Sequence, residues 1–163
     1  MTEQTSRVGD FDAAYRRWYP DVFRYVRRRV GDDLAGDVAS EVFTVAWRRQ
    51  DKLLAAEHQL AWLYGVAKLC VANARRARRR RGALAERAIA QPHRTEHEPD
   101  VEVLDALDRL APADREILML LAWDGLAGAE LAVALGCSEA AARKRLSRAR
   151  TRLTEALEGG HDA

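Results

Sequence analysis

Apolar side chains recur every three or four residues along most of this chain, and this spacing restricts its fold more than any other feature. Residues 10–81 keep the spacing almost without a break, and it returns in residues 101–153. Apolar residues at that interval give an α-helix one buried face. No alternating run typical of a strand and no internal repeat stands out. The sequence therefore predicts an all-α protein.

The first stretch divides into three predicted helices, at about residues 10–30, 34–49 and 60–81. We expect Pro20 to kink or restart the first helix, because proline removes a hydrogen bond of the helix. A turn at residues 31–33, with an aspartate as N-cap, separates the first two helices, and a polar loop at residues 50–59 precedes the third. The predicted inward side chains are Phe11, Tyr15, Trp18, Val22, Tyr25, Val26 and Val30, then Leu34, Val38, Val42, Val45 and Ala46, then Leu60, Leu63, Val66, Ala67, Cys70, Val71 and Ala74.

The second stretch predicts a helix at residues 101–110, another at 112–123 that Pro112 begins, and then a helix-turn-helix. Gly136 permits the tight turn, and Ser138 is a suitable N-cap for the last helix. Residues 82–100 carry two prolines and no sustained period, which indicates a linker, with a candidate helix at residues 83–90. We expect two small helical domains, residues 1–81 and 101–163, joined by a flexible linker at 82–100.

The positive charges are concentrated in two places. Residues 1–81 carry 17 basic and 10 acidic side chains, and six arginines fall within residues 75–81. Residues 138–152 hold six basic side chains against the single acid Glu139. One such cluster would fit an ordinary solvated helix face. Two clusters, each at the end of a helical segment, indicate a polyanionic partner, and nucleic acid in particular.

The last helix has the residue types that reading a DNA groove requires. Small residues at 140–142 allow close approach, arginine can bond guanine edges, and lysine or arginine can neutralise phosphates. We expect Leu146 and Leu153 to face inward and four polar side chains to face DNA, namely Arg143, Lys144, Ser147 and Arg148. An exposed amphipathic helix that contacts a partner protein is the alternative interpretation.

The N-terminal domain offers two further candidate surfaces. Trp62 and Tyr64 precede the arginines of the third helix, and aromatic beside basic side chains suit stacking on unpaired bases. The four tryptophans at positions 18, 47, 62 and 123 fit a hydrophobic core better than a base platform. On the second helix a polar side becomes a candidate docking face, formed by Asp37, Ser40, Glu41 and Thr44.

Three stretches together resemble a known family: DLAGDVASEVFTVAWRR, then QLAWLYGVAKLCVANARRARRRR, then LDRLAPADREILMLLAWDGLAGAELAVALGCSEAAARKRLSRARTRL. In this order and spacing they are similar to regions 2 and 4 of the small, two-domain extracytoplasmic-function group of sigma-70 factors. The resemblance covers nearly the whole chain apart from the termini and the linker. The last stretch alone would equally fit the DNA-binding domain of a response regulator.

The resemblance implies a role for each of several positions. Asp37, Ser40 and Glu41 match the patch that docks on the clamp helices of the RNA polymerase β′ subunit, and residues 51–58 match the loop that captures a flipped-out base. Serine at position 40 replaces a common glutamine, and Leu69 replaces a common asparagine. The other matched positions are Trp62, Lys68, Asn73, Arg76 and Arg80 for the minus-ten element, and Arg143, Lys144, Ser147 and Arg148 for the minus-35 element, with Arg145 and Arg150 at phosphates.

The implied partners are core RNA polymerase, through its β′ clamp helices and β flap, and promoter DNA, while an anti-sigma partner is left open. In the family the linker runs toward the RNA exit path. Its acidic residues, Glu86, Glu96, Glu98 and Asp100, would mimic nucleic acid there, or the segment is a plain spacer.

Enzymatic activity is not expected, because the sequence has no glycine-rich phosphate loop, nucleophile elbow or HExxH motif. We expect no metal or cofactor, since His93 and His97 lie between two prolines of the linker, and Cys70 and Cys137 are far apart and fit buried apolar positions. The absence of a long apolar run and of a signal peptide predicts a cytoplasmic protein without a membrane segment. A stand-alone helix-turn-helix regulator and a purely protein-binding adaptor remain alternative functions.

Overall fold

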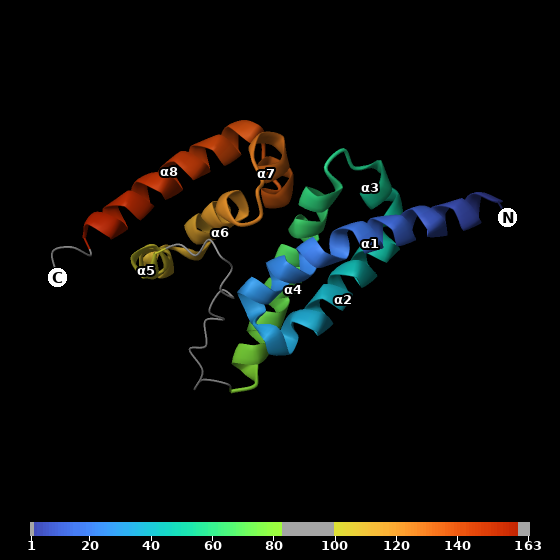
Figure 1. Ribbon diagram of the computed structural model, residues 1–163, viewed down its shortest axis with the longest axis horizontal. Helices are drawn as coiled ribbons and strands as arrows, with labels where there is room; N and C mark the ends of the chain where they lie inside the picture. The colour runs from blue at the N-terminus through green and yellow to red at the C-terminus, as the bar shows by residue number, and fades with distance from the viewer. Residues whose placement is uncertain (1, 83–99, 160–163) are drawn as a thin grey trace. The chain divides into compact units, whose positions relative to one another are not determined.

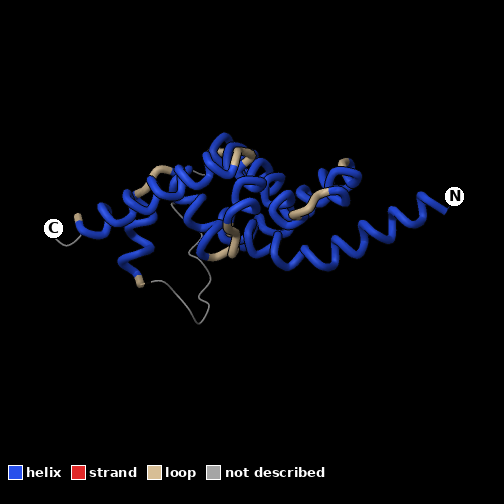
Figure 2. Tube along the Cα trace, turned by 90° about the horizontal axis from the view of Figure 1, so that it is seen from above, coloured by secondary structure: helices blue, strands red, loops and turns tan. Residues whose placement is uncertain are grey.

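The computed structural model of the chain describes residues 2–82 and 100–159, which contain eight helices and no strand (Figures 1 and 2). This confirms the all-α prediction. The described residues form two compact units, one on each side of residues 83–99. None of the described helices has the length and apolar character needed to cross a membrane. The helices are α1 (Thr2–Val30), α2 (Asp32–Arg48), α3 (Gln50–Ala55), α4 (Gln59–Arg80), α5 (Val101–Arg109), α6 (Pro112–Ala122), α7 (Gly128–Leu135) and α8 (Glu139–Glu158).

In the first unit α1, α2 and α4 pack against one another as a three-helix bundle, and the short α3 joins α2 to α4 (Figure 1). The core includes many of the inward side chains that the three-and-four spacing predicts, but Leu34, Val45, Leu60, Val66 and Ala74 are only half-buried. Val22 and Val26 of α1, Val42 of α2, and Leu63 and Ala67 of α4 are fully buried. Burial of such side chains is the main favourable contribution to the stability of the bundle.

Helix α1 continues through Pro20, whereas the sequence predicted a kink or a restart there. A proline inside a helix costs about 3 kcal/mol. The buried residues that follow it, Val22, Tyr25 and Val26, pack into the core only if the helix continues. We attribute the unbroken helix to this packing, which outweighs the local cost.

The turn from α1 to α2 depends on Gly31 rather than on an aspartate cap. Gly31 is the N-cap residue with φ 89°, and no side chain caps α2. Positive φ is costly for residues with a Cβ atom, so glycine suits this position. Asp32 and Asp33 instead lie in the first turn of α2 and bind Arg27 and Arg78, respectively.

The predicted polar loop at residues 50–59 is largely helical. Residues 50–55 form α3, and its Leu53 is completely buried. In the sequence Leu53 follows two charged residues, Asp51 and Lys52, so the sequence predicts a polar loop there. Asp51 forms an ion pair of 3.0 Å with Arg7 of α1. The connection between α3 and α4 is therefore only residues 56–58.

Aromatic rings line the contact between α1 and α2, but two of them reach the surface. Tyr15 is 39% exposed and Trp47 is 42% exposed, although the sequence predicted that both would be buried. Tyr15 packs edge-on against Phe43 at 4.8 Å, and Trp47 packs edge-on against Phe11 at 4.9 Å. Each ring covers a buried partner while its other side stays in solvent.

In the second unit α8 packs against α5, α6 and α7. Pro112 begins α6, as predicted. Gly136 adopts the left-handed conformation with φ 65° between α7 and α8, and the side chain of Ser138 accepts a hydrogen bond of 3.2 Å from the main-chain nitrogen of Ala141. The predicted helix-turn-helix and its N-cap are thus confirmed.

Candidate nucleic-acid interface

Helix α8 has one packed side and one solvent side. Ala142 and Ala149 are buried, and Leu146 and Leu153 are half-buried, as the spacing of four, three and four residues requires. Ala142 was expected to approach DNA with its neighbours, but it belongs to the packed side. Ala140 is the exposed small residue at the start of the helix.

The solvent side of α8 carries most of the cations of the second cluster. Arg143 and Arg150 are seven residues apart and share one flank, while Arg145 and Arg148 lie on the other flank. Lys144 projects between them. The exposed polar side chains of this recognition surface are those named from the sequence: Arg143, Lys144, Arg145, Ser147, Arg148 and Arg150.

Arg152, the sixth cation of the cluster, has a different role. Its guanidinium Nη1 lies 2.6 Å from Oδ2 of Asp114, whose side chain is only 12% exposed. Beside this ion pair Arg115 donates to the main-chain carbonyls of Leu107 and Asp108, at 3.0 and 2.7 Å. These contacts fix α8 to α6 and α6 to α5, so they hold the recognition surface in place.

Helix α4 presents a second polar side, which runs from Trp62 to Arg80. Trp62, Leu69, Asn73, Arg76 and Arg80 are spaced by seven, four, three and four residues, so they share one side of the helix. Trp62 is half-buried, and the four others are exposed. Leu69, with 66% of its surface exposed, is an apolar side chain among polar ones.

Two residues predicted to contribute to this surface do not lie on it. Lys68 is exposed, but it projects about a third of a turn away from the row that contains Trp62. Tyr64 is 3% exposed and stacks on Tyr25, with ring centroids 4.7 Å apart. Tyr64 is therefore part of the core and cannot stack on a base.

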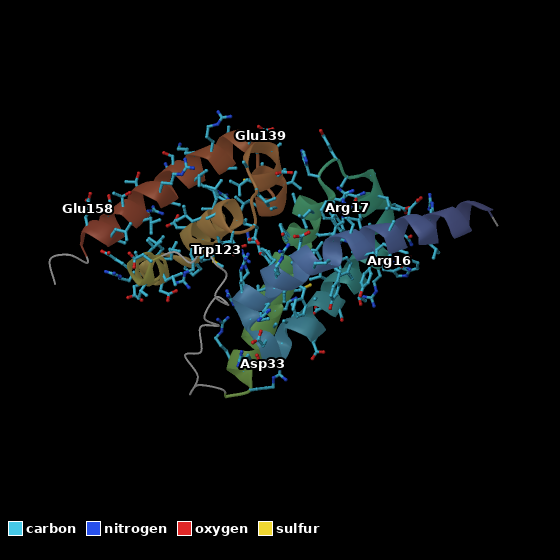
Figure 3. The ribbon with its side chains drawn as sticks, viewed as in Figure 1. Arg16, Arg17, Asp33, Trp123, Glu139 and Glu158 are labelled. Atoms are coloured by element: carbon cyan, nitrogen blue, oxygen red, sulfur yellow. The ribbon has the colours of Figure 1, made fainter. Side chains whose placement is uncertain are left out.

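Two of the six arginines at the end of α4 bind the end of α1 and the start of α2. Arg75 donates two hydrogen bonds, at 3.1 and 2.8 Å, to the main-chain carbonyl of Arg29. Arg78 donates to the carbonyl of Val30 at 3.3 Å and to a carboxylate oxygen of Asp33, also at 3.3 Å. Helix ends leave such carbonyls without partners, and cations there are favourable. These two arginines therefore stabilise the end of α1 and the start of α2, where Figure 3 labels Asp33.

The polar side of α2 is exposed as predicted. Asp37, Ser40, Glu41 and Thr44 all face solvent, while Val38 and Val42 between them are buried. The hydroxyl of Thr44 donates to the carbonyl of Ser40 at 2.8 Å. This acidic surface would repel a phosphate backbone, so within a basic unit it fits a protein partner.

One group near the start of α4 was not singled out by the sequence. The guanidinium carbon of Arg17 lies 4.6 Å from the ring centroid of Trp18, and Trp18 donates its indole N–H to Oε1 of Gln59 at 3.0 Å. Trp18 was assigned to the core, yet it is only half-buried. The only sequence signal was the adjacency of an arginine and a tryptophan.

The candidate histidines of the linker and its acids Glu86, Glu96 and Glu98 lie outside the described residues, as does the candidate helix at 83–90. Within the described part of the chain, no group of three histidine, cysteine or acidic side chains could hold a metal ion. Cys70 is buried and Cys137 is half-buried, and both are free thiols.

Two family models match the chain. The model of sigma-70 region 2 matches residues 14–81, and that of sigma-70 region 4 matches residues 100–153. The first match includes α4 and the acidic side of α2, and the second includes α8 as far as residue 153.

Curated relatives agree with these matches. The sigma factor SigD of Mycobacterium tuberculosis, of the extracytoplasmic-function group, is 36% identical over 161 residues, which covers 88% of this chain and 74% of SigD. A probable RNA polymerase sigma factor, RfaY of Xanthomonas campestris, is 35% identical over 133 residues, or 74% of this chain. The match covers only 33% of RfaY, so this chain spans about a third of that relative.

Solved structures share the fold. The sigma factor RpoE of Bartonella quintana, crystallised with the anti-sigma factor NepR, aligns with a TM-score of 0.70 and 24% identity over 91% of this chain and 97% of that one. CnrH, solved with the cytosolic domain of CnrY, aligns with a TM-score of 0.63 and 24% identity over 91% of this chain and 88% of that one.

Proposed function

Because the chain belongs to the extracytoplasmic-function group of the sigma-70 family, and is thus a sigma factor that directs transcription initiation, we propose how its surfaces share that task. The acidic side of α2 binds core RNA polymerase. The exposed side of α4 holds the opened minus-ten element, and the recognition surface of α8 reads the minus-35 element. The observation that carries this division is that cations and acids occupy separate exposed helix sides.

The geometry of α8 supports its proposed role in recognition. An α-helix fits the major groove of duplex DNA, where arginine forms bidentate hydrogen bonds with guanine. Arg143, Lys144, Ser147 and Arg148 are exposed and placed for base edges, while Arg145 and Arg150 neutralise flanking phosphates. The buried alanines on the packed side keep the helix in a fixed orientation while these side chains read DNA.

The α4 surface suits an unpaired strand rather than a duplex. Opening DNA costs a few kcal/mol per unstacked base, and a protein that hydrolyses no nucleotide offsets this cost by binding the released strand. Trp62 offers an aromatic face, Asn73 offers hydrogen bonds, and Arg76 and Arg80 attract phosphates. Lys68 lies outside this surface, so we do not assign it a contact with the strand.

Polymerase docking is assigned to Asp37, Ser40 and Glu41. Two exposed carboxylates separated by one helical turn form a compact negative patch. Such a patch selects a basic partner surface and orients it on approach. The partner surface that we propose is the pair of clamp helices of the β′ subunit, with the β flap as the partner of the second unit.

We assign polymerase binding and the minus-ten element to a domain at residues 1–81, and the minus-35 element to a domain at residues 101–163. Residues 82–100 link the two domains. Two weak DNA-binding units on one chain raise each other's effective concentration.

We also infer that an anti-sigma factor is a partner of this chain. RpoE was solved in a complex with an anti-sigma factor, and CnrH with the cytosolic domain of CnrY. Family membership does not favour the stand-alone regulator.

Run-off transcription tests the proposal. The full chain is combined with core polymerase and a library of templates that vary in the minus-ten and minus-35 regions. We expect discrete transcripts from a subset of templates that share both elements, and none from core polymerase alone. If the chain instead shifted duplex DNA tightly by itself and programmed no template, the stand-alone regulator would replace our proposal.

A further inference from the structure

Arg17 and Trp18 of α1 form a prearranged pair beside the first residue of α4. The guanidinium of Arg17 lies over the Trp18 ring at 4.6 Å from its centroid, a distance at which a cation is attracted to an aromatic face. The indole N–H of Trp18 bonds Gln59 at 3.0 Å, which fixes the ring relative to α4. Gln59 is one helical turn before Trp62, so the pair lies next to the beginning of the α4 surface.

Arg17 differs from its neighbour Arg16 in what it binds. Arg16 pairs with Asp12 at 2.9 Å, which neutralises its charge, although its side chain is 78% exposed. Arg17 is also exposed, and it forms no ion pair with a described residue. Figure 3 labels Arg17 on the side of α1 toward α3 and the start of α4, and Arg16 away from it. The charge of Arg17 is therefore available to an anion at that place.

We propose that the Arg17–Trp18 pair is an additional binding site for an unpaired base of the opened DNA strand, continuous with the α4 surface. The base stacks on the guanidinium that Trp18 supports from below, and the adjacent phosphate is attracted by its charge. Bases of single-stranded nucleic acid stack on aromatic rings and on guanidinium planes. This inference rests on the proposed function, because it extends the path of the same strand.

A protein partner is less suited to this position. The acidic side that we assign to polymerase lies on α2, and the α1 rings that pack toward α2 include Tyr15 and Tyr19, which contact Phe43. Trp18 contacts α4 instead, through Gln59, and Arg17 lies over the Trp18 ring. An exposed cation on an aromatic ring, near the Trp62 end of the α4 surface, favours a negatively charged, π-rich ligand, and single-stranded DNA is that ligand.

The test uses holoenzyme assembled from the full chain and core polymerase, on a template that the wild-type holoenzyme transcribes in the run-off selection. The probe is this template with a mismatched, unpaired minus-ten region that carries 2-aminopurine, compared with the fully paired template. The variants are Arg17→Ala and Trp18→Leu, and Arg16→Ala is the matched control. Thermal unfolding of each variant shows whether the bundle is intact, and the affinity for core polymerase is measured separately.

We expect Arg17→Ala to weaken binding of the unpaired probe by about tenfold and to reduce the quenching of 2-aminopurine. The magnitude of the slope of log binding constant against log salt concentration should fall by about 0.7. Arg16→Ala should change none of these quantities. Trp18→Leu should weaken binding and reduce the quenching as Arg17→Ala does, but it should leave the salt slope unchanged because it removes no charge. Unchanged affinity of the Arg17→Ala holoenzyme for the unpaired probe would overturn this inference but not the proposed function. A loss of core polymerase affinity in that variant would also overturn it, in favour of a protein contact. If wild-type holoenzyme transcribed no template, the proposed function would fail first, and the inference with it.

Discussion

Arg152 of α8 and Asp114 of α6 form an ion pair in which Nη1 and Oδ2 are 2.6 Å apart. Asp114 is nearly enclosed, so removing its partner leaves a carboxylate with little access to water. We expect Arg152→Ala to lower the free energy of unfolding of the second unit by about 1–3 kcal/mol. Chemical denaturation followed by circular dichroism measures this, with the exposed Arg150→Ala as the control. Equal losses for both variants would contradict a structural role of the pair.

Neighbouring arginines of α4 should separate stability from DNA binding. Arg75→Ala removes two hydrogen bonds to the carbonyl of Arg29, and we expect a loss of about 1–3 kcal/mol in unfolding free energy. Arg76→Ala should leave stability within about 0.5 kcal/mol, because its side chain is exposed. In the holoenzyme, Arg76→Ala should instead weaken binding of single-stranded DNA and lower the salt slope by about 0.7. The reverse pattern would disprove our division of the arginine cluster.

Reversing the charge of the α2 surface should weaken polymerase binding. With Asp37→Lys and Glu41→Lys together, a basic partner surface is repelled rather than attracted, and we expect affinity for core polymerase to fall at least about tenfold. Binding is measured by fluorescence anisotropy of the labelled chain. The control is Asp10→Lys, which reverses an exposed carboxylate of α1 elsewhere in the same unit. Unchanged affinity in the double variant would move the docking site away from α2.

The opposite result is expected for α8. Each bidentate contact between arginine and guanine contributes about 1–3 kcal/mol of discrimination. We therefore expect Arg143→Ala with Arg148→Ala to remove the preference for the minus-35 element in run-off transcription, while core polymerase binding remains. Arg109→Ala, at an exposed position of α5, should change neither. Loss of core binding in the double variant would show that α8 does not act on DNA alone.

Cys70 makes stability depend on pH in the alkaline range. Burial, and secondarily the charge of Glu41, raises the pKa of this thiol from 9.0 to about 11. The folded state therefore holds the proton more tightly than the unfolded state, so this stabilisation is complete below pH 9.0 and is lost as pH rises toward about 11. Unfolding measured across this range should show a smaller decline for Cys70→Ala than for the wild type. Alkylation of the folded chain should modify Cys137 before Cys70.

Periodicity predicted the helices whose core contacts repeat regularly. It failed for segments whose conformation depends on one or a few contacts. Val22 and Val42 follow the three-and-four rule and are buried as predicted. Pro20 is a helix breaker by local rules, and only the packing of residues that follow it explains the unbroken α1. In α3 a single leucine, Leu53, anchors a six-residue helix, and such a short element has no detectable period.

Helical spacing predicted which candidate side chains are exposed, but it could not predict which of them bind residues far away in the sequence. The exposed sides of α2 and α8 follow from helical spacing alone. Arg75 and Arg78 could not be separated from Arg76, because their acceptors are main-chain carbonyls 46 and 48 residues earlier in the chain. Likewise the bond from Trp18 to Gln59 joins residues 41 apart, which no local pattern reveals.

Helix α8 has separate packed and exposed sides, and this separation has a consequence for how promoter preference can evolve. Its packing depends on small and aliphatic side chains at positions 142, 146, 149 and 153, and none of these lies on the exposed side that we propose reads DNA. If the exposed side of α8 reads the minus-35 element as proposed, substitutions at Arg143, Lys144 and Ser147 would change promoter preference without loss of the folded state. A duplicated gene can acquire a new regulon by a few point mutations on one helix, and a synthetic promoter can be matched to a redesigned copy by the same route.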